Sequence, residues 1–169
     1  MRHSWSASVR VMPETSDSVS AERIIPAPAE AIFALIADPR RHKDIDGSGT
    51  VRDAKVSGEA KEVPQHLELG STFGMAMKLG IPYSMVSTVI ELEPNRRIAW
   101  QTRPPIGKRL AGGRIWRYVL EPVEGGTKVT ETWDISQEVF KPLVRGARSK
   151  TKKDMATTLE NIERIVTGG

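Results

Sequence analysis

The first apolar positions of the chain change from a strand pattern to a helix pattern across two prolines. A strand is expected from about residue 18, and it cannot continue through Pro26 and Pro28 because proline has no N–H to donate. Pro28 suits the first turn of a helix, where that N–H would be unpaired anyway. Pro39 ends this helix, and residues 40–46 are expected to form a second short helix. The first helix buries one face, formed by Ile32, Phe33, Leu35 and Ile36.

Six further strands are expected after the helix pair, because alternating apolar and polar residues are interrupted by Gly, Pro and Asn. The linkers EPNRR and EPVEGGT have the composition of hairpin turns, so the strands that they join should be antiparallel. The expected strands lie at about 51–57, 71–79, 83–93, 96–103, 113–122 and 127–136.

The chain is expected to end in a long amphipathic helix. Thr151 and Asp154 resemble a capping box at its start, and Gly168 provides its end. Strands grouped after an early helix pair predict an α+β fold, with the helices on one face of an antiparallel sheet. The apolar stripe of the last helix is Met155, Leu159, Ile162 and Val166, with Ile165 beside it.

Alternation within the strands divides the predicted sheet into an apolar face and a polar face. The apolar face is expected to hold Phe73, Met75, Met77, Val86, Thr88, Ile90, Leu92, Ile98, Trp100, Trp116, Tyr118, Leu120, Val129, Glu131, Trp133 and Ile135. The polar face is expected to hold Lys78, Ser87, Glu91, Arg97, Gln101, Arg117, Thr130, Thr132 and Asp134. A single helical stripe is narrow for seven strands, so either large side chains fill the remaining space or a cavity is left.

The apolar face is consistent both with a filled core and with a ligand cavity. Any one of its bulky residues can simply fill the core, whereas the whole set, with its few polar groups, is what a pocket for a hydrophobic ligand needs. The residues predicted to contact such a ligand are Phe73, Met75, Met77, Thr88, Ile90, Trp100, Trp116, Tyr118, Glu131, Trp133, Met155 and Leu159.

Glu131 is the one candidate for catalytic chemistry. A carboxyl group on an apolar face should have a raised pKa, which suits a general acid or base, and Tyr118 on a neighbouring strand could donate to it. The alternative is a buried ion pair with Arg103 or Arg114. We favour the ion pair, because cyclase chemistry needs a second positioned group and the sequence indicates none. No catalytic residue is therefore assigned, and an enzyme is the less favoured class.

Other kinds of site are not supported by the composition. The chain has no cysteine, which excludes disulfides, thiolate zinc sites and a cysteine nucleophile. His42, Asp44 and Asp46 lack the spacing of a calcium loop, and His66 stands alone in a polar connector. A nucleophile elbow, a dinucleotide-binding glycine pattern and a P-loop are all missing. Neither a metal nor a cofactor is expected.

The formal net charge of +4 is unevenly spread, with many Lys and Arg and no acid in residues 141–153. This segment could bind an acidic partner or nucleic acid, but a solvated helix face is favoured because the segment contains no stacking aromatic residue. A nucleic-acid partner is therefore not expected. Met85 and Val89, taken as facing outward, are too few to indicate an oligomeric state.

Residues 1–16 show no sustained period and are expected to form a flexible tail before one domain at 17–169. No apolar run approaches the roughly 20 residues that a membrane span requires. The N-terminus also lacks the apolar block of a secretory signal, so the expected location is the cytoplasm.

Three phrases resemble the START-like superfamily, and within it the polyketide cyclase/dehydrase and lipid transport group. They are IIPAPAEAIFALIADP, TVIELEPNRRIAWQT and GGRIWRYVLEPVEGGTKVTETWDIS, and the resemblance covers about residues 18–166. It implies the helix-grip fold, in which a seven-stranded antiparallel sheet wraps around the last helix and an internal cavity opens near the end of that helix. Members of the group carry lipids, steroids, hormones or polyketides, and some act on them. The group has no shared catalytic signature to carry over.

Three functions are consistent with these observations. The first is binding, and with it transport, of a lipid-like or polyketide-like molecule in the cavity. The second is a cyclase or dehydratase that uses Glu131, with Tyr118 as a supporting group. The third is a scaffold that meets an acidic partner through residues 141–153. The first is preferred, because the predicted apolar face provides a place for a ligand without requiring a catalyst.

Overall fold

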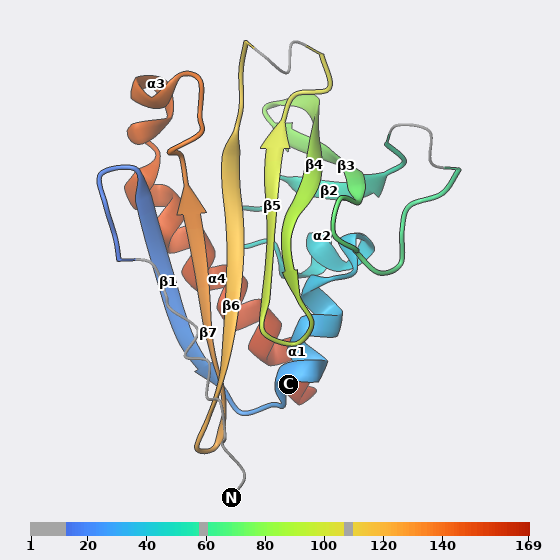
Figure 1. Cartoon of the computed structure of the whole chain (residues 1–169), viewed down its shortest axis with the longest axis vertical. Coiled ribbons are helices and arrows are strands. Elements are labelled where there is room, and N and C mark those ends of the chain that lie inside the picture. The colour runs from blue at the N-terminus through green and yellow to red at the C-terminus, as the bar shows by residue number, and fades with distance from the viewer. Residues whose placement is uncertain (1–12, 58–60, 107–109) are drawn as a thin grey trace, which may run out of the picture.

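The computed structural model describes residues 13–57, 61–106 and 110–169 (Figure 1). These residues form one antiparallel sheet in the order β1-β7-β6-β5-β4-β3-β2, with the helices on one side of it. The elements are β1 Ser18–Ile25, α1 Ala29–Ile36, η1 Pro39–Arg41, α2 His42–Ile45, β2 Val51–Lys55, β3 Thr72–Leu79, β4 Ile81–Glu93, β5 Arg97–Arg103, β6 Arg114–Val123, β7 Gly126–Asp134, α3 Lys141–Arg145 and α4 Arg148–Thr167.

This arrangement confirms the predicted α+β fold, with a seven-stranded antiparallel sheet gripping a long C-terminal helix. The two hairpin linkers join β4 to β5 and β6 to β7, as their composition indicates. The helix α4 packs mainly against β1 and β7, at one end of the sheet. The helices α1 and α2 contact β6 and β2 from the same side, so the core lies between these helices and the inner face of the sheet.

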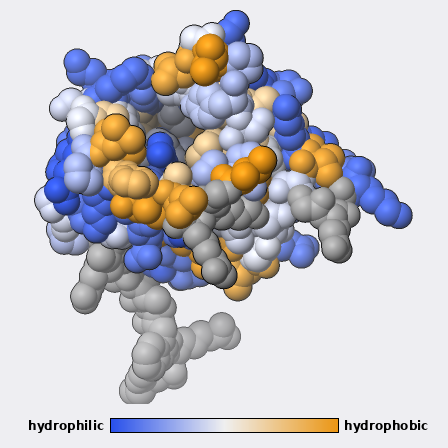
Figure 2. All heavy atoms as spheres, turned by 90° about the horizontal axis from the view of Figure 1, so that it is seen from above, coloured by the Kyte–Doolittle hydropathy of each residue, from blue (hydrophilic) through white to orange (hydrophobic). Residues whose placement is uncertain are grey.

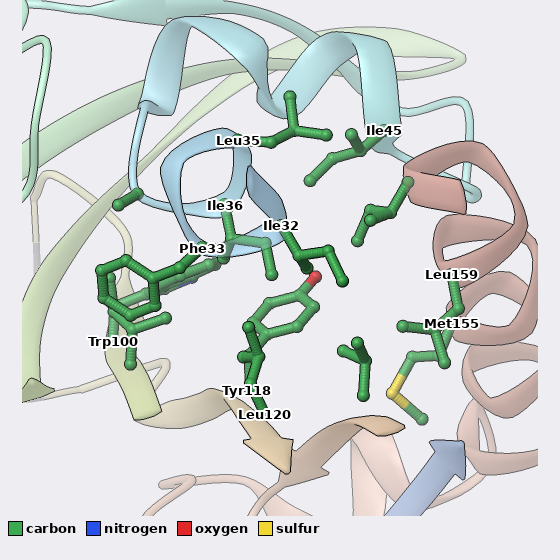
Figure 3. Close-up of a cluster of buried hydrophobic side chains, with 14 of the residues drawn as sticks. Ile32, Phe33, Leu35, Ile36, Ile45, Trp100, Tyr118, Leu120, Met155 and Leu159 are labelled. Atoms are coloured by element: carbon green, nitrogen blue, oxygen red, sulfur yellow. The ribbon is translucent and has the colours of Figure 1, made fainter. Parts of the chain in front are cut away.

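The corner after β1 forms as the prolines predict. Pro28 has an extended backbone and stands at the N-cap position of α1, one residue before the helix. The apolar face of α1 is buried in the core, where its side chains lie opposite Tyr118 and Leu120 (Figure 3). Gly126 lies against this corner, because a Cβ there would stand 2.1 Å from the carbonyl oxygen of Ile25.

The start of the C-terminal helix differs from the prediction. The helix α4 begins at Arg148, its N-cap is Ala147, and no side chain caps it. The predicted capping box is wrong: Thr151 lies within the helix, and Asp154 instead accepts a hydrogen bond from Lys150 Nζ at 2.6 Å. The helix ends at Gly168, which has a left-handed φ of 74° as predicted.

The basic segment 141–153 forms α3 and the first turns of α4, which makes it largely helical. The sequence had not predicted α3. Its basic side chains pair with acids near the N-terminus, since Lys141 and Arg145 bind Asp17, and Arg148 and Lys152 bind Glu14. Glu14 belongs to the segment expected to be a flexible tail, whose residues 1–12 lie outside the described chain.

The strand β4 corrects the predicted faces of the sheet. Its pairing with β5 shifts in register between Val89 and Glu91, so the alternation before this bulge is out of phase with the alternation after it. Ser87 stands opposite Phe73 of β3 and faces inward, as does Val89 opposite Trp100. The inward placement of Val86, Thr88 and Ile90, and the outward placement of Met85, Ser87 and Val89, were therefore wrong.

A glycine holds the connection between α2 and β2 against α4. The Gly47 N–H donates to Thr158 Oγ1 at 2.9 Å, and Asn161 Nδ2 donates to the Ile45 carbonyl at 3.2 Å. A Cβ at position 47 would stand 2.1 Å from the carbonyl oxygen of Asp154, which is backbone of α4. Only glycine allows this close approach.

Gly47→Ala is expected to lower the free energy of unfolding by about 1–3 kcal/mol, because the added methyl group forces the connection away from α4. The control is Gly146→Ala, whose Cβ would meet no atom within 4 Å and whose φ is −61°. The control should be neutral or slightly stabilising. Urea unfolding of both variants measures the difference, and equal stability would contradict the proposed close packing.

Candidate ligand-binding site

A cavity of about 470 Å³ lies between the inner face of the sheet and the helices. It exists because α4 packs on β1 and β7, while α1 and α2 cover only part of the inner faces of β3, β4, β5 and β6. The sheet side is formed by Val51, Phe73, Met75, Met77, Leu79, Tyr83, Met85, Ser87, Trp100, Thr102, Arg114, Trp116, Tyr118, Glu131 and Trp133. The helices and connections contribute His42, Ile45, Asp46, Ser48, Thr50, Leu143, Val144, Ala147, Lys150, Thr151, Asp154, Met155 and Thr158.

Most of the residues predicted to contact a ligand are brought together here. Thr88 and Ile90 are the exceptions on the sheet, because the bulge turns them to the outer face, where Ile90 is 38% exposed. Leu159 is 1% exposed and belongs to the packed core rather than to the cavity wall. The cavity is lined by the others, Phe73, Met75, Met77, Trp100, Trp116, Tyr118, Glu131, Trp133 and Met155.

Several lining residues were missed by the sequence interpretation. Thr102 follows Trp100 at a spacing of two, so the alternation of β5 already contained the signal for it. Ser87 and Met85 could not be found in this way, because the bulge is invisible to a count of alternate residues. His42 and Asp46 come from the α2 region, whose position over the sheet depends on the tertiary packing.

The cavity has a layered order that follows the strands. Its polar layer holds Tyr118 and Glu131, which are paired in the register of β6 and β7. Two residues nearer the opening on the same strands, Trp116 and Trp133 form the next layer, with ring centroids 6.5 Å apart. Two residues in the other direction, Leu120 and Val129 are completely buried in the core and form the floor, while Ile98 stands opposite Tyr118.

The opening is surrounded by apolar side chains. Leu79 at the end of β3 and Leu143 in α3 both line the cavity and are 68% and 82% exposed. Ile81 and Phe140, which neighbour them in the chain, are also exposed. Figure 2 looks down on this end of the molecule and shows hydrophobic groups around a hollow. An apolar molecule therefore meets apolar side chains at this opening.

Glu131 is a buried acid with one hydrogen-bond partner. The Tyr118 hydroxyl donates to its Oε1 at 2.8 Å, whereas Oε2 has no partner among the described residues. Burial, opposed by the Tyr118 hydrogen bond and reinforced by the nearby charge of Asp46, raises the pKa of Glu131 to about 8. Burial and Glu131 also hold the pKa of Tyr118 well above its usual value. At neutral pH the Glu131 carboxyl group is mostly protonated.

The expected ion pair between Glu131 and an arginine is not formed. Arg114 instead donates to Glu138 at 3.1 Å, and no arginine, Arg103 included, contributes to the pKa of Glu131. The reason is positional, since Arg114 stands at the opening while Glu131 lies deeper along the neighbouring strand.

His42 is the second titratable group of the polar layer. Its Nε2 lies 2.8 Å from the carbonyl oxygen of Ile36, so Nε2 carries the hydrogen and donates it. The ring stacks on Trp100 at a centroid distance of 5.0 Å and meets Phe73 edge-on. Burial lowers the pKa of His42, which keeps the imidazole neutral near pH 7.

The family model for polyketide cyclase / dehydrase and lipid transport matches residues 16–167. The chain belongs to this family. Its relatives include the protein Rv0088 of Mycobacterium tuberculosis, which is 42% identical over 128 residues, or 75% of this chain and 51% of the relative. The chain thus spans about half the length of the curated relatives that it matches.

Solved structures share the fold at low identity. Protein CV1439 from Chromobacterium violaceum superposes with a TM-score of 0.67 and 16% identity, covering 90% of this chain and 98% of that protein. The AHSA1-like protein from Aeromonas hydrophila gives a TM-score of 0.58 and 19% identity, covering 89% and 92%. These similarities confirm the START-like fold assignment and carry no information on the ligand.

Among the residues that the structure describes, no helix is long and apolar enough to cross a lipid bilayer. In the same part of the chain, His, Asp and Glu side chains form no cluster of three that could hold a metal ion.

Glu131→Gln should change how stability depends on pH. The folded-state pKa of about 8 lies above the ordinary value of 4.5, so the stability that the neutral Glu131 carboxyl group contributes is complete below pH 4.5 and is lost as pH rises through 8. Between these limits the unfolding free energy of the wild-type protein should fall by about 4 kcal/mol relative to Glu131→Gln. Urea unfolding across this pH range measures the difference. Glu124→Gln, at an exposed turn, is the control, and parallel curves for wild type and Glu131→Gln would refute the buried neutral acid.

Proposed function

We propose that the protein binds a hydrophobic small molecule in the cavity between the sheet and α4, and carries it. The supporting observation is the cavity itself, which is walled by indole, thioether and phenyl groups and has an apolar opening. Its volume of about 470 Å³ falls within the range of about 300–1,000 Å³ typical of small-molecule sites. The family is consistent with this reading, and its description includes lipid transport.

The walls of the cavity are held apart by the rest of the structure. Gly47 and Asn161 fix the α2 connection to α4 on one side, and the ladder of strands fixes the other side. The floor is packed with completely buried side chains, so the space above it is bounded below by Tyr118, Glu131 and the core. A lipid-like or polyketide-like molecule that fills it would bury apolar surface against Trp116, Trp133 and Met75. We place this carrier in the cytoplasm.

A neutral fluorescent probe, N-phenyl-1-naphthylamine, tests whether the cavity binds apolar molecules. Ser87→Phe places a ring inside the cavity, whereas Thr88→Phe places the same ring on the outer face of β4. Ser87→Phe should weaken probe binding at least tenfold, and Thr88→Phe should leave it unchanged. Energy transfer from the indoles to the bound probe provides the measurement. Equal affinities for the two variants would mean that the cavity is not the site.

Native mass spectrometry of freshly isolated protein complements the probe. We expect an added mass that is lost on denaturation and that is absent from Ser87→Phe. A bound ligand should also raise the melting temperature of the wild-type protein, because it binds only the folded state.

The second candidate function is a dehydratase or cyclase, and it is favoured by the state of Glu131. A protonated carboxyl group in an apolar cavity can give its proton to a leaving hydroxyl group, as a general acid does. Tyr118 would then stabilise the resulting carboxylate through its existing hydrogen bond. His42 is the second titratable group that such chemistry needs, and the sequence alone had not indicated it.

A β-hydroxy ketone, 4-hydroxy-4-phenylbutan-2-one, tests this candidate. Its dehydration releases one water and forms a conjugated enone, which is followed by ultraviolet absorbance. If the protein is a dehydratase, Glu131→Gln should lower the rate by at least about 100-fold while retaining the probe affinity. Turnover no faster than in buffer, or equal turnover in both proteins, excludes this enzyme and leaves the carrier function standing.

A further inference from the structure

The deepest polar group of the cavity has an unused hydrogen-bonding atom. Glu131 is 3% exposed, and its Oε1 accepts the hydrogen of the Tyr118 hydroxyl. Its Oε2 is buried without a partner among the described residues. A buried polar atom without a hydrogen bond is unfavourable, so a ligand that supplies one should bind about tenfold more tightly than a ligand of the same shape that does not.

The geometry also fixes which hydrogen-bonding role Oε2 takes. In a neutral carboxyl group one oxygen accepts and the other carries the proton. Because Oε1 already accepts from Tyr118, the proton lies on Oε2, which is therefore a donor. The raised pKa of Glu131 supports this state at neutral pH.

The charged groups around the cavity do not offer Glu131 a counter-ion. The titratable groups that face this space, besides Glu131, are Tyr83 from β4, Tyr118 and Arg114 from β6, His42 from α2, Asp46 from the connection after α2, and Lys150 and Asp154 from α4. Both cations are engaged elsewhere, Lys150 with Asp154 and Arg114 with Glu138. The nearest charge is the carboxylate of Asp46, which disfavours an anion.

We propose that the ligand is a neutral hydrophobic carbonyl compound, whose carbonyl oxygen accepts a hydrogen bond from Glu131 Oε2 at the base of the cavity. Its apolar remainder lies between Trp116 and Trp133 and extends toward Leu79 and Leu143 at the opening. A carboxylate head group is excluded from this position because no cation meets it there. This inference rests on the proposed binding function and specifies the chemical class and orientation of the ligand.

Four naphthalene derivatives of nearly equal shape test the proposal by displacing the fluorescent probe. They are 2-acetylnaphthalene, 2-ethylnaphthalene, 1-(2-naphthyl)ethanol and 2-naphthoate. At pH 6.5 the ketone should bind about tenfold more tightly than the hydrocarbon and at least tenfold more tightly than the carboxylate. At pH 9.5, where Glu131 is ionised, the advantage of the ketone over the hydrocarbon should disappear. The alcohol should keep its affinity, because it can donate to the carboxylate.

Two variants connect these differences to Glu131. Glu131→Gln keeps an N–H donor, so the ketone should retain its advantage and lose its pH dependence. In Glu131→Leu the ketone should bind no more tightly than the hydrocarbon at either pH value, and the affinity for the hydrocarbon should be unchanged. Glu124→Gln is the control and should behave as the wild-type protein does. If Glu131→Leu does not fold, Glu131→Gln alone tests the proposal, because the affinity for the ketone should no longer depend on pH in this variant.

The outcomes separate this inference from the proposed function. Equal affinities for ketone and hydrocarbon at pH 6.5, or tightest binding of the carboxylate, would overturn the inference and leave a hydrophobic carrier. Probe binding that none of the four compounds displaces would also overturn it. If the probe itself does not bind to the wild-type protein, the proposed function fails as well.

Discussion

The architecture depends on one geometric constraint, which is that a single helix cannot cover the inner face of seven strands. The helix α4 packs against β1 and β7, where it completes the core, and it does not cover the strands farther along the sheet. The α2 connection approaches α4 from the other side and is held there by Gly47. Between these supports part of the inner face of the middle strands is left uncovered, and the space over it is the cavity.

The same constraint explains why an acid can persist inside the molecule. In a completely packed core Glu131 would need a buried counter-charge, because an isolated carboxylate is costly to desolvate. Here the neutral form, with one hydrogen bond from Tyr118, occupies the boundary between the solid floor and the cavity. The polar pair thus lies where the packed core meets the cavity.

Alternation in the sequence was sufficient to predict the inner faces of β3, β5, β6 and β7, including the inward position of Glu131. It failed for the first half of β4, since a bulge changes the phase without leaving a mark such as glycine or proline at Ile90. The partner of Glu131 was also predicted wrongly, because the choice between an arginine and a tyrosine depends on depth along the strand. The volume of the cavity lay beyond prediction, as it is set by the distance between α4 and the sheet.

The bulge in β4 determines how the cavity wall responds to insertions and deletions. On either side of Ile90 the partners are consecutive, since Val89 stands opposite Trp100 and Glu91 opposite Ala99. Deleting Ile90 would restore regular pairing and leave the inner face unchanged, whereas deleting Thr88 with the bulge kept would move Ser84 and Val86 to the inner face. A change of one residue in this strand can therefore either spare the interior or replace part of its wall, depending on its position relative to the bulge.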